Sequence, residues 1–296
     1  MEHAYLILAH KTDLTFYTLL YMLDYPNNSL FIHMDRKNKE FDACSMEHVR
    51  QNLRYATVYF TERTDVRWGS YSLVYAIVIL LKKAVRTGKY NYYHLLSGED
   101  LPIQSHESID NFFTKYNGLE FIELEPAREG GGYHDLDRVR YYHWFQERLG
   151  RENKKYIIRL LRKITLSVQK LLHIQRNRSI LFMRGSNWFS ITDELAHYVL
   201  DQEDWIKKIF RYTFCADELF LQTIVYHSRF QEMLFQKDGK EYSCMRSIDF
   251  QRGTPWIWRE EDYEKLLESD MLFARKFDAK VDRNIIEKIK RYYSGK

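Results

Sequence analysis

Short apolar runs alternate with longer amphipathic stretches throughout the first 120 residues of this chain. Such alternation is typical of βα units, in which each strand is followed by a helix that packs back onto the sheet. We expect strands at 4–9, 30–34, 57–60, 92–96 and 119–124, and helices at 13–23, 41–53, 70–85 and 107–115. The pattern predicts an α/β fold with a mostly parallel sheet that is covered by helices on both faces.

The pattern changes after residue 124. Three consecutive glycines, Gly130, Gly131 and Gly132, predict a loop. Expected helices follow at 134–149, 154–174, 193–209, 217–228 and 260–268 and from 282 onward, with expected strands at 179–183, 188–191 and 242–250. We find no internal repeat and no composition typical of a linker, so we expect one continuous domain.

The composition excludes several classes of function. The chain carries 45 Lys and Arg against 41 Asp and Glu, and a formal charge of +4 over 296 residues does not indicate a nucleic-acid partner. Its three cysteines form no Cys-x-x-Cys pair, so neither a disulfide scaffold nor a zinc ribbon is expected. The longest apolar run, 73–81, is about half of what a membrane-spanning helix needs, and the N-terminus lacks the basic flank of a signal peptide. These features predict a cytoplasmic protein.

Polar side chains follow each of the first four predicted strands. His10 follows the first strand and Asp35 the second, while the segments 66–70 and 97–100 follow the third and fourth. Ligands of open α/β sheets bind outside the carboxyl ends of the strands, so we expect these clusters to share one crevice. The first strand is not followed by Gly-x-Gly-x-x-Gly, and the chain has no Gly-Lys-Ser/Thr loop, which disfavours a dinucleotide dehydrogenase and a P-loop enzyme.

Seven blocks of sequence, in order along nearly the whole chain, resemble one known family. They are Ala9-His10-Lys11, Ile32-His33-Met34-Asp35, Trp68-Gly69-Ser70, Tyr93-His94-Leu95-Leu96-Ser97-Gly98-Glu99-Asp100-Leu101-Pro102-Ile103, Phe182-Met183-Arg184-Gly185-Ser186-Asn187-Trp188-Phe189, Cys215-Ala216-Asp217-Glu218 and Leu272-Phe273-Ala274-Arg275-Lys276-Phe277-Asp278. The chain resembles the core-2/I-branching β-1,6-N-acetylglucosaminyltransferases, glycosyltransferase family 14, which also includes peptide O-xylosyltransferases. It looks like a bacterial-type member.

The resemblance implies a GT-A-like, Rossmann-like fold that binds a UDP-sugar and inverts the anomeric carbon. It also implies that no divalent metal or other cofactor is needed, because basic side chains neutralise the departing diphosphate. We expect a single catalytic domain over 1–296, with a nucleotide-sugar-binding half at 1–124 and an acceptor and catalytic half at 125–296. The sequence shows no counterpart of the membrane anchor, stem and multiple cysteines of the animal Golgi enzymes, so their acceptor and linkage are not carried over.

The matched positions assign roles by resemblance. Glu218 matches the catalytic base, and a positioned carboxylate that removes a proton is what attack by a sugar hydroxyl requires. His10 and Asp35 match family positions that line the uridine pocket. Asp100 matches the position where other GT-A enzymes hold a metal. Arg252 and Lys276 match the family's diphosphate-binding pair. Without the family, Glu218 reads as a first-turn helix carboxylate and Arg252 as a solvated surface charge.

Acceptor contacts follow less directly from the resemblance. A family glutamate after the fifth strand corresponds to Glu120 or to Glu123, depending on where a gap is placed. Trp188 has a ring face that suits stacking on a sugar, although aromatic residues mostly fill cores. The chain's only Asp-x-Asp sequence, Asp135-Leu136-Asp137, lies in a helical context and is interpreted as a chance match, so no metal ligand is assigned.

One feature falls outside this chemistry. From 153 to 192 the chain has no acidic residue but nine basic ones: Lys154, Lys155, Arg159, Arg162, Lys163, Lys170, Arg176, Arg178 and Arg184. Apolar residues keep helical spacing on one face of the predicted helix 154–174. A basic amphipathic helix of this kind is typical of peripheral contact with an anionic membrane. The alternative is a helix packed on the core with a solvated basic face.

The sequence therefore predicts an inverting, metal-independent enzyme that transfers N-acetylglucosamine from UDP-N-acetylglucosamine to a hydroxyl of a glycan acceptor, with lipid-linked glycans among the acceptors considered. A first alternative is the same fold using UDP-xylose or another UDP-sugar. A second alternative, of another class, is a non-catalytic α/β module that binds membranes or polyanions. The expected location is the cytoplasm, with peripheral contact at the inner face of the membrane through 154–174.

Overall fold

The central sheet is buried on both faces. In the computed structural model, which describes residues 1–128, 135–149, 156–239 and 241–293, six strands lie in the order β3-β2-β1-β4-β9-β6. They are β1 (His3–Ala9), β2 (Asn28–Met34), β3 (Thr57–Phe60), β4 (Tyr92–Ser97), β6 (Phe121–Ile122) and β9 (Phe189–Thr192). β1 to β4 run parallel, and β9 runs antiparallel to β4 and β6. The predicted α/β fold with a mostly parallel sheet is confirmed.

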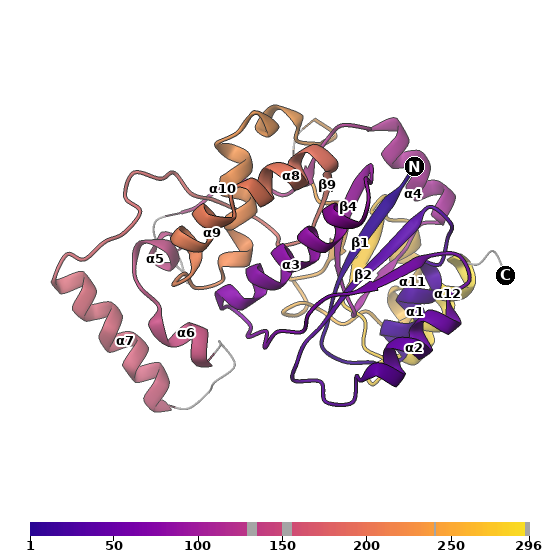
Figure 1. Cartoon of the computed structure of the whole chain (residues 1–296), viewed down its shortest axis with the longest axis horizontal. Coiled ribbons are helices and arrows are strands. Elements are labelled where there is room, and N and C mark those ends of the chain that lie inside the picture. The colour runs from indigo at the N-terminus through magenta and orange to yellow at the C-terminus, as the bar shows by residue number, and fades with distance from the viewer. Residues whose placement is uncertain (129–134, 150–155, 240, 294–296) are drawn as a thin grey trace.

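Two hydrophobic clusters cover the two faces of this sheet (Figure 1). Alternate residues of β1 belong to different clusters: Leu6 packs in one and Ile7 in the other, as the two-residue period of a strand requires. The helices that contribute to the first cluster are α3 (Tyr71–Thr87), α8 (Asp193–Asp201), α9 (Glu203–Phe210) and α10 (Phe220–Tyr226). Those of the second are α1 (Leu14–Met22), α2 (Ala43–Asn52), α4 (His106–Lys115), α11 (Tyr263–Leu267) and α12 (Arg283–Tyr293).

A smaller sheet extends the carboxyl end of β4. It consists of β12 (Arg246–Ile248), β13 (Phe273–Arg275) and β5 (Asp100–Pro102), in that order. β13 is parallel to β12 and antiparallel to β5, and Arg275 lies opposite Asp100. Only Gly98 and Glu99 separate β5 from β4. The small sheet therefore brings residues from the C-terminal part of the chain to the edge where ligands of open α/β sheets bind.

The later half differs from the predicted elements in its boundaries. The predicted helix 134–149 forms two helices, α5 (Asp135–Arg140) and α6 (Trp144–Leu149), and the predicted helix 193–209 is divided at Gln202 into α8 and α9. The predicted helix 217–228 forms a 3-10 turn, η1 (Ala216–Glu218), and α10. The remaining strands are short pairs: β7 (Glu125–Pro126) with β8 (Met183–Arg184), and β10 (Gln236–Lys237) with β11 (Glu241–Tyr242).

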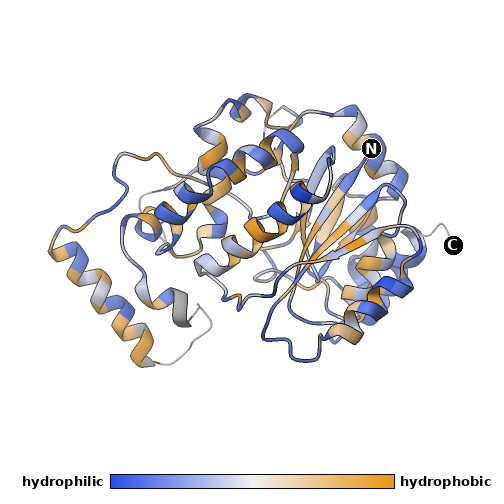
Figure 2. Ribbon diagram, viewed as in Figure 1, coloured by the Kyte–Doolittle hydropathy of each residue, from blue (hydrophilic) through white to orange (hydrophobic). Residues whose placement is uncertain are grey.

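The predicted basic helix is α7 (Tyr156–Leu171), and it lies at one end of the molecule, away from the sheet (Figure 1). Lys154 and Lys155, and the predicted glycine loop at 130–132, lie outside the described residues. Along α7, hydrophobic and hydrophilic residues alternate around the helix (Figure 2). Among the described residues, no helix has the length and apolar character needed to cross a bilayer.

Candidate functional site

The carboxyl ends of β1 and β4 meet the small sheet in a cluster of charged side chains, which we call the Glu99 cluster. His10 and Lys11 follow β1, Glu99 follows β4, and Arg275 and Lys276 come at the end of β13. The backbone holds these segments together, because Gly98 N donates to Leu8 O (2.9 Å) and Phe277 N donates to Glu99 O (2.9 Å).

Glu99 lies at the centre of this cluster and is 4% exposed. One carboxylate oxygen is 2.9 Å from Lys11 Nζ, and the other is 2.8 Å from Lys276 Nζ. Burial acts to raise the pKa of Glu99, but the hydrogen bonds and charges of Lys276 and Lys11 outweigh burial and lower it. Glu99 is therefore an ionised, buried anchor for two cations.

The two lysines differ in how fully they are engaged. Lys11 Nζ also lies 2.9 Å from Asp13 and 3.1 Å from Asp278, so its three donors face three carboxylates. Burial acts to lower the pKa of Lys11, but the hydrogen bonds to Asp13 and Glu99 outweigh it and raise the pKa. Among the described carboxylates, Lys276 pairs within 4.0 Å with Glu99 alone, and its side chain is 27% exposed. Lys276 thus has donors left for a ligand.

Arg275 ties the small sheet to the end of β4. Its guanidinium is 2.6 Å from Asp100 Oδ1, and the other Asp100 oxygen accepts from Ser97 N at 2.7 Å. The guanidinium also lies over the ring of Trp188, 4.4 Å from its centroid. Sequence reasoning placed Glu99 in the predicted crevice, within 97–100, but gave it no role, and it missed Lys11 and Arg275 as site residues, although all three lie inside blocks that carry the resemblance. Asp100 is held by Arg275 and by Ser97, and it is 2% exposed.

The two residues predicted to line the uridine pocket lie beside this cluster. His10 is exposed, and its Nε2 is 3.8 Å from Glu99. Partial burial lowers the pKa of His10, against the opposite effect of Glu99. Asp35 lies next to the end of β1, since its N–H donates to Ala9 O (2.8 Å), and its carboxylate accepts from Lys37 N at 2.9 Å.

Arg252 lies in a loop that contacts the same strand end. Its guanidinium is bound by two carboxylates, at 2.7 Å from Asp249 and 2.7 Å from Asp262. It also lies 5.5 Å from the ring centroid of Trp258, and the backbone N–H of Trp258 donates to Lys276 O at 2.9 Å. Arg252 is thus close to the predicted diphosphate site, but it would have to exchange a carboxylate for a phosphate.

Glu218 stands at the end of η1 with its side chain 43% exposed. It accepts from Arg138 Nη1 at 2.5 Å, so a guanidinium holds the carboxylate in place. Arg138 also lies 3.6 Å from Asp135. The other carboxylate of the Asp-x-Asp sequence, Asp137, pairs with Lys170 at 2.7 Å, so the two aspartates are held by different cations.

A glycine connects Glu218 to the Glu99 cluster. Gly185 N donates to Glu218 O at 3.1 Å, and a Cβ atom at Gly185 would lie only 2.0 Å from Glu123 O, so a side chain does not fit between them. Glu123 accepts from Ser186 N at 3.1 Å. Trp188, three residues after Gly185, lies beneath the guanidinium of Arg275. One segment therefore passes from the proposed base to the cationic cluster.

Two predicted acceptor residues are placed differently from expectation. Glu120 is fully buried and accepts from Thr192 N (2.9 Å), so it cannot touch an acceptor in this arrangement. Of the two glutamates considered as the acceptor contact, only Glu123 lies beside Gly185. Trp188 is 7% exposed and one face of its ring is covered by Arg275, so it supports Arg275 instead of presenting a free stacking face.

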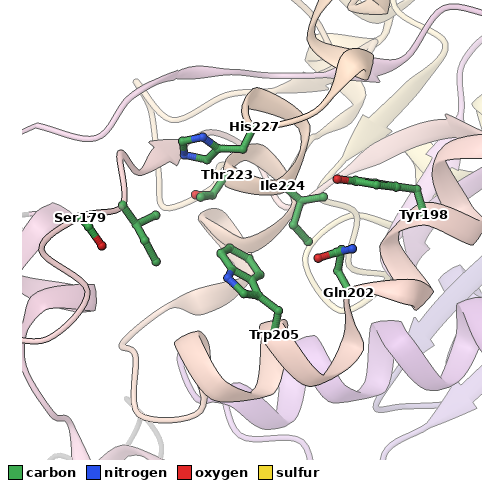
Figure 3. A pocket seen from close by; sticks show the side chains of 8 residues that line it. Ser179, Tyr198, Gln202, Trp205, Thr223, Ile224 and His227 are labelled. Atoms are coloured by element: carbon green, nitrogen blue, oxygen red, sulfur yellow. The ribbon is translucent and has the colours of Figure 1, made fainter.

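The described residues include no group of three or more His, Cys, Asp or Glu side chains arranged to hold a metal ion. A cavity of about 330 Å³ lies elsewhere, between α8, α9 and α10 (Figure 3). Its lining includes Tyr198, Gln202, Trp205 and His227, and none of the predicted site residues. The candidate site thus consists of the Glu99 cluster and of Glu218, and it does not include this cavity.

Comparisons with known proteins identify relatives of this chain. Xylosyltransferase 2 of Rattus norvegicus is 22% identical over 304 residues, covering 96% of this chain and 33% of that protein. Xylosyltransferase 1 of Homo sapiens is 21% identical over 284 residues, covering 90% of this chain and 27% of that protein. The chain therefore spans about a third of the length of the curated relatives it matches.

Similarity to solved structures is weak by comparison. A crystal structure of residues 1–349 of TarS from S. aureus shares 11% identity, with 48% of this chain and 41% of that chain covered and a TM-score of 0.29, which is too low to support an argument. A sequence model of a known family, in contrast, matches residues 3–266, which is most of the chain. This chain belongs to the Core-2/I-branching enzyme family, which is a family of glycosyltransferases.

Proposed function

We propose that this chain transfers a sugar from a UDP-sugar donor to a hydroxyl group of a glycan acceptor. The observation that carries the proposal is the placement of Lys276. Its ammonium group is held by the buried Glu99 at the carboxyl end of the sheet and keeps donors for a ligand. Cationic donors fixed at this edge suit a diphosphate. Family membership supplies the class of reaction.

In the proposed reaction Glu218 acts as the general base. Its carboxylate accepts the proton of the acceptor hydroxyl while that oxygen forms a bond to the anomeric carbon. The bond from this carbon to the diphosphate oxygen breaks, and UDP leaves with the electron pair. Attack on the side opposite the leaving group inverts the anomeric configuration. The hydrogen bond from Arg138 at 2.5 Å holds the Glu218 carboxylate in position before the acceptor arrives.

We further propose that the reaction needs no divalent metal. Negative charge grows on the diphosphate as the glycosidic bond breaks, and fixed cations stabilise that charge in place of a metal ion. Lys276 is the first candidate, with Arg275 behind it on the same strand end. Arg252 is the second candidate, because releasing Asp249 would leave it paired with Asp262 while it binds a phosphate.

The identity of the donor sugar rests on two different observations. The family description, a branching enzyme, supports the predicted UDP-N-acetylglucosamine. The names of the two relatives reported above, both xylosyltransferases, favour UDP-xylose as the second candidate. The two sugars differ at two carbons, since xylose has neither the acetamido group nor the hydroxymethyl group. A competition assay therefore separates them clearly.

We also propose an acceptor and a cellular location. Glu123, beside Gly185, is the proposed acceptor contact. A glycan, including a lipid-linked one, is the proposed acceptor, and the cytoplasmic face of a membrane is the proposed location. A non-catalytic module of the same fold would need neither Glu218 nor Lys276 and would bind no UDP-sugar.

The test is a panel of UDP-sugars, scored for binding by calorimetry and for turnover with and without EDTA. Glu218→Gln should lower kcat about 10²- to 10⁴-fold while the affinity for the donor is kept. Glu232→Gln, at an exposed glutamate of the turn η2 (Arg229–Met233), is the matched control and should behave as the wild type.

Three outcomes would contradict parts of the proposal. Full turnover by Glu218→Gln would remove Glu218 as the base. Activity that EDTA abolishes and Mn²⁺ restores would refute the metal-free reaction. Failure to bind any UDP-sugar would favour the non-catalytic module.

A further inference from the structure

Helix α7 exposes its apolar side chains to solvent instead of burying them. Seven apolar side chains, six in α7 and one directly after it, are between 40% and 77% exposed: Ile157, Leu160, Leu161, Ile164, Val168, Leu171 and Leu172. Successive helical residues lie about 100° apart, so these positions form one stripe about 120° wide. The sequence left open whether this helix packs on the core, and these exposures exclude that arrangement.

The body of the protein holds α7 by a different face. Gln169 is 2% exposed, and its side-chain amide exchanges two hydrogen bonds with the backbone of Tyr142, at 2.8 and 3.1 Å. Lys170 pairs with Asp137 of α5 at 2.7 Å. Because polar contacts attach the helix, its apolar stripe remains directed outward, at the end of the molecule that lies away from the sheet (Figure 1).

The charge around this stripe selects the partner. Residues 153–192 contain nine basic and no acidic side chains. Lys163 lies on the flank of α7 that faces neither the body nor the apolar stripe, and it is exposed. Lysines in such positions can bury their aliphatic stems at an interface while the ammonium reaches anionic groups. A second copy of the chain would instead place two strongly basic segments against each other, which like-charge repulsion disfavours.

We propose that α7 docks on an anionic lipid surface, with its apolar stripe in the region between headgroups and acyl chains and with its basic residues among the headgroups. This is the arrangement of an interfacial amphipathic helix. The proposal does not depend on the reaction catalysed, since docking uses none of the residues of the Glu99 cluster and does not involve Glu218.

The experiment measures co-sedimentation of the full chain with phosphatidylcholine vesicles, with and without phosphatidylglycerol, at low and high salt. No UDP-sugar is present, so the result is independent of activity. We expect binding only when phosphatidylglycerol is included, and weaker binding at high salt. Ile157→Gln, Ile164→Gln and Leu171→Gln together should lower the partition coefficient at least about tenfold. Lys163→Gln and Arg178→Gln should lower it about fivefold for each charge removed.

The control carries Tyr55→Gln and Tyr292→Gln, at side chains that are 60% and 45% exposed and far from α7 in the sequence, and it should bind as the wild type does. All replaced side chains are exposed, and circular dichroism with thermal unfolding checks that each variant folds. Absence of binding to anionic vesicles at low salt would overturn the proposal. Binding of the triple apolar variant to anionic vesicles at the wild-type level would also overturn it. A third contrary result is a wild-type chain that binds no vesicles but forms a dimer in sedimentation equilibrium, while the triple variant is a monomer. The partner of the apolar stripe would then be a second copy of the chain.

Discussion

At the scale of single residues, Glu99 binds two lysines, Lys11 and Lys276, that differ in how many carboxylates surround them. Lys11 is surrounded by three carboxylates, so its charge is used within the protein. Among the described carboxylates, Lys276 pairs with Glu99 alone. Both ammonium groups have three donors, but only Lys276 has donors left for a phosphate. The same anchor therefore supports one structural cation and one that is available to a ligand.

Replacing these lysines should separate binding from stability. Lys276→Met should weaken UDP binding about 10- to 100-fold, because a hydrogen bond to a charged group contributes about 1.5–3 kcal/mol. Lys11→Met should chiefly lower the melting temperature, since three carboxylates lose their shared cation. Calorimetry with UDP and thermal unfolding measure the two effects.

Lys237→Met is the control for this pair. Lys237 is similarly exposed, at 30%, and also forms one ion pair, with Asp270 at 2.8 Å. It should change neither UDP affinity nor, by more than a few tenths of a kcal/mol, stability. Equal UDP affinity in Lys276→Met and the wild type would show that this lysine does not bind diphosphate.

At the scale of elements, Glu120 joins β6, β9 and α8. It comes directly before β6, and its carboxylate accepts from Thr192 N (2.9 Å) and Thr192 Oγ1 (2.5 Å). Thr192 ends β9 and also caps α8, since its Oγ1 accepts from Leu195 N at 3.3 Å. Burial raises the pKa of Glu120 from 4.5 to about 7, which the two bonds from Thr192 only partly offset. The folded protein therefore binds a proton that the unfolded chain releases.

This shifted pKa predicts a pH dependence of folding. Because the folded-state pKa of Glu120 is raised, its contribution to stability is largest below pH 4.5 and is lost as pH rises to about 7. Glu120→Gln cannot ionise, so the variant should gain about 3 kcal/mol relative to the wild type over this range. Urea unfolding at several pH values measures it.

Comparing the two proteins at each pH is essential here. His3 is also buried, and burial lowers its pKa to about 4, so protonation of His3 destabilises the fold as pH falls through the same range. Both proteins contain His3, and its effect cancels in their difference. A difference in unfolding free energy that stays constant between pH 4.5 and 8 would show that Glu120 titrates normally.

The elements that the sequence predicts well are those with an unbroken local signal. β1, β2 and β4 each contain a run of mostly apolar residues, and all seven residues of β1 are buried. β5 and β13 are three residues long, and what defines them is the pairing of Arg275 with Asp100, which are 175 positions apart. No local pattern reports such a pair. For this reason Lys11 and Arg275 were missed and Glu99, although placed in the predicted crevice, was given no role, whereas Lys276 was found only through the family resemblance.

At the scale of the whole molecule, one buried arginine joins the two sheets. Arg246 of β12 donates to Ser190 Oγ at 2.8 Å, to the carbonyl oxygen of Phe189 at 2.6 Å and to that of Leu95 at 3.3 Å. It also donates to Cys244 O and lies over the ring of Phe273, 4.9 Å from its centroid. The acceptors belong to β4 and β9 of the central sheet, so Arg246 fixes the small sheet against the large one.

Loosening this connection should therefore affect both stability and the site. Arg246→Met should lower the free energy of unfolding by about 3 kcal/mol or more, because several buried acceptors lose their donor. It should also weaken UDP binding, since β13 lies between β12 and β5 and ends in Arg275, next to Lys276.

Arg229→Met removes an exposed arginine that pairs with Glu194, and should change stability by less than about 1 kcal/mol and leave UDP affinity unchanged. Urea unfolding and calorimetry measure both quantities. If Arg246→Met unfolds at the wild-type urea concentration, the two sheets are held together by apolar packing alone; if it is destabilised but binds UDP normally, the diphosphate site does not depend on how β13 is held.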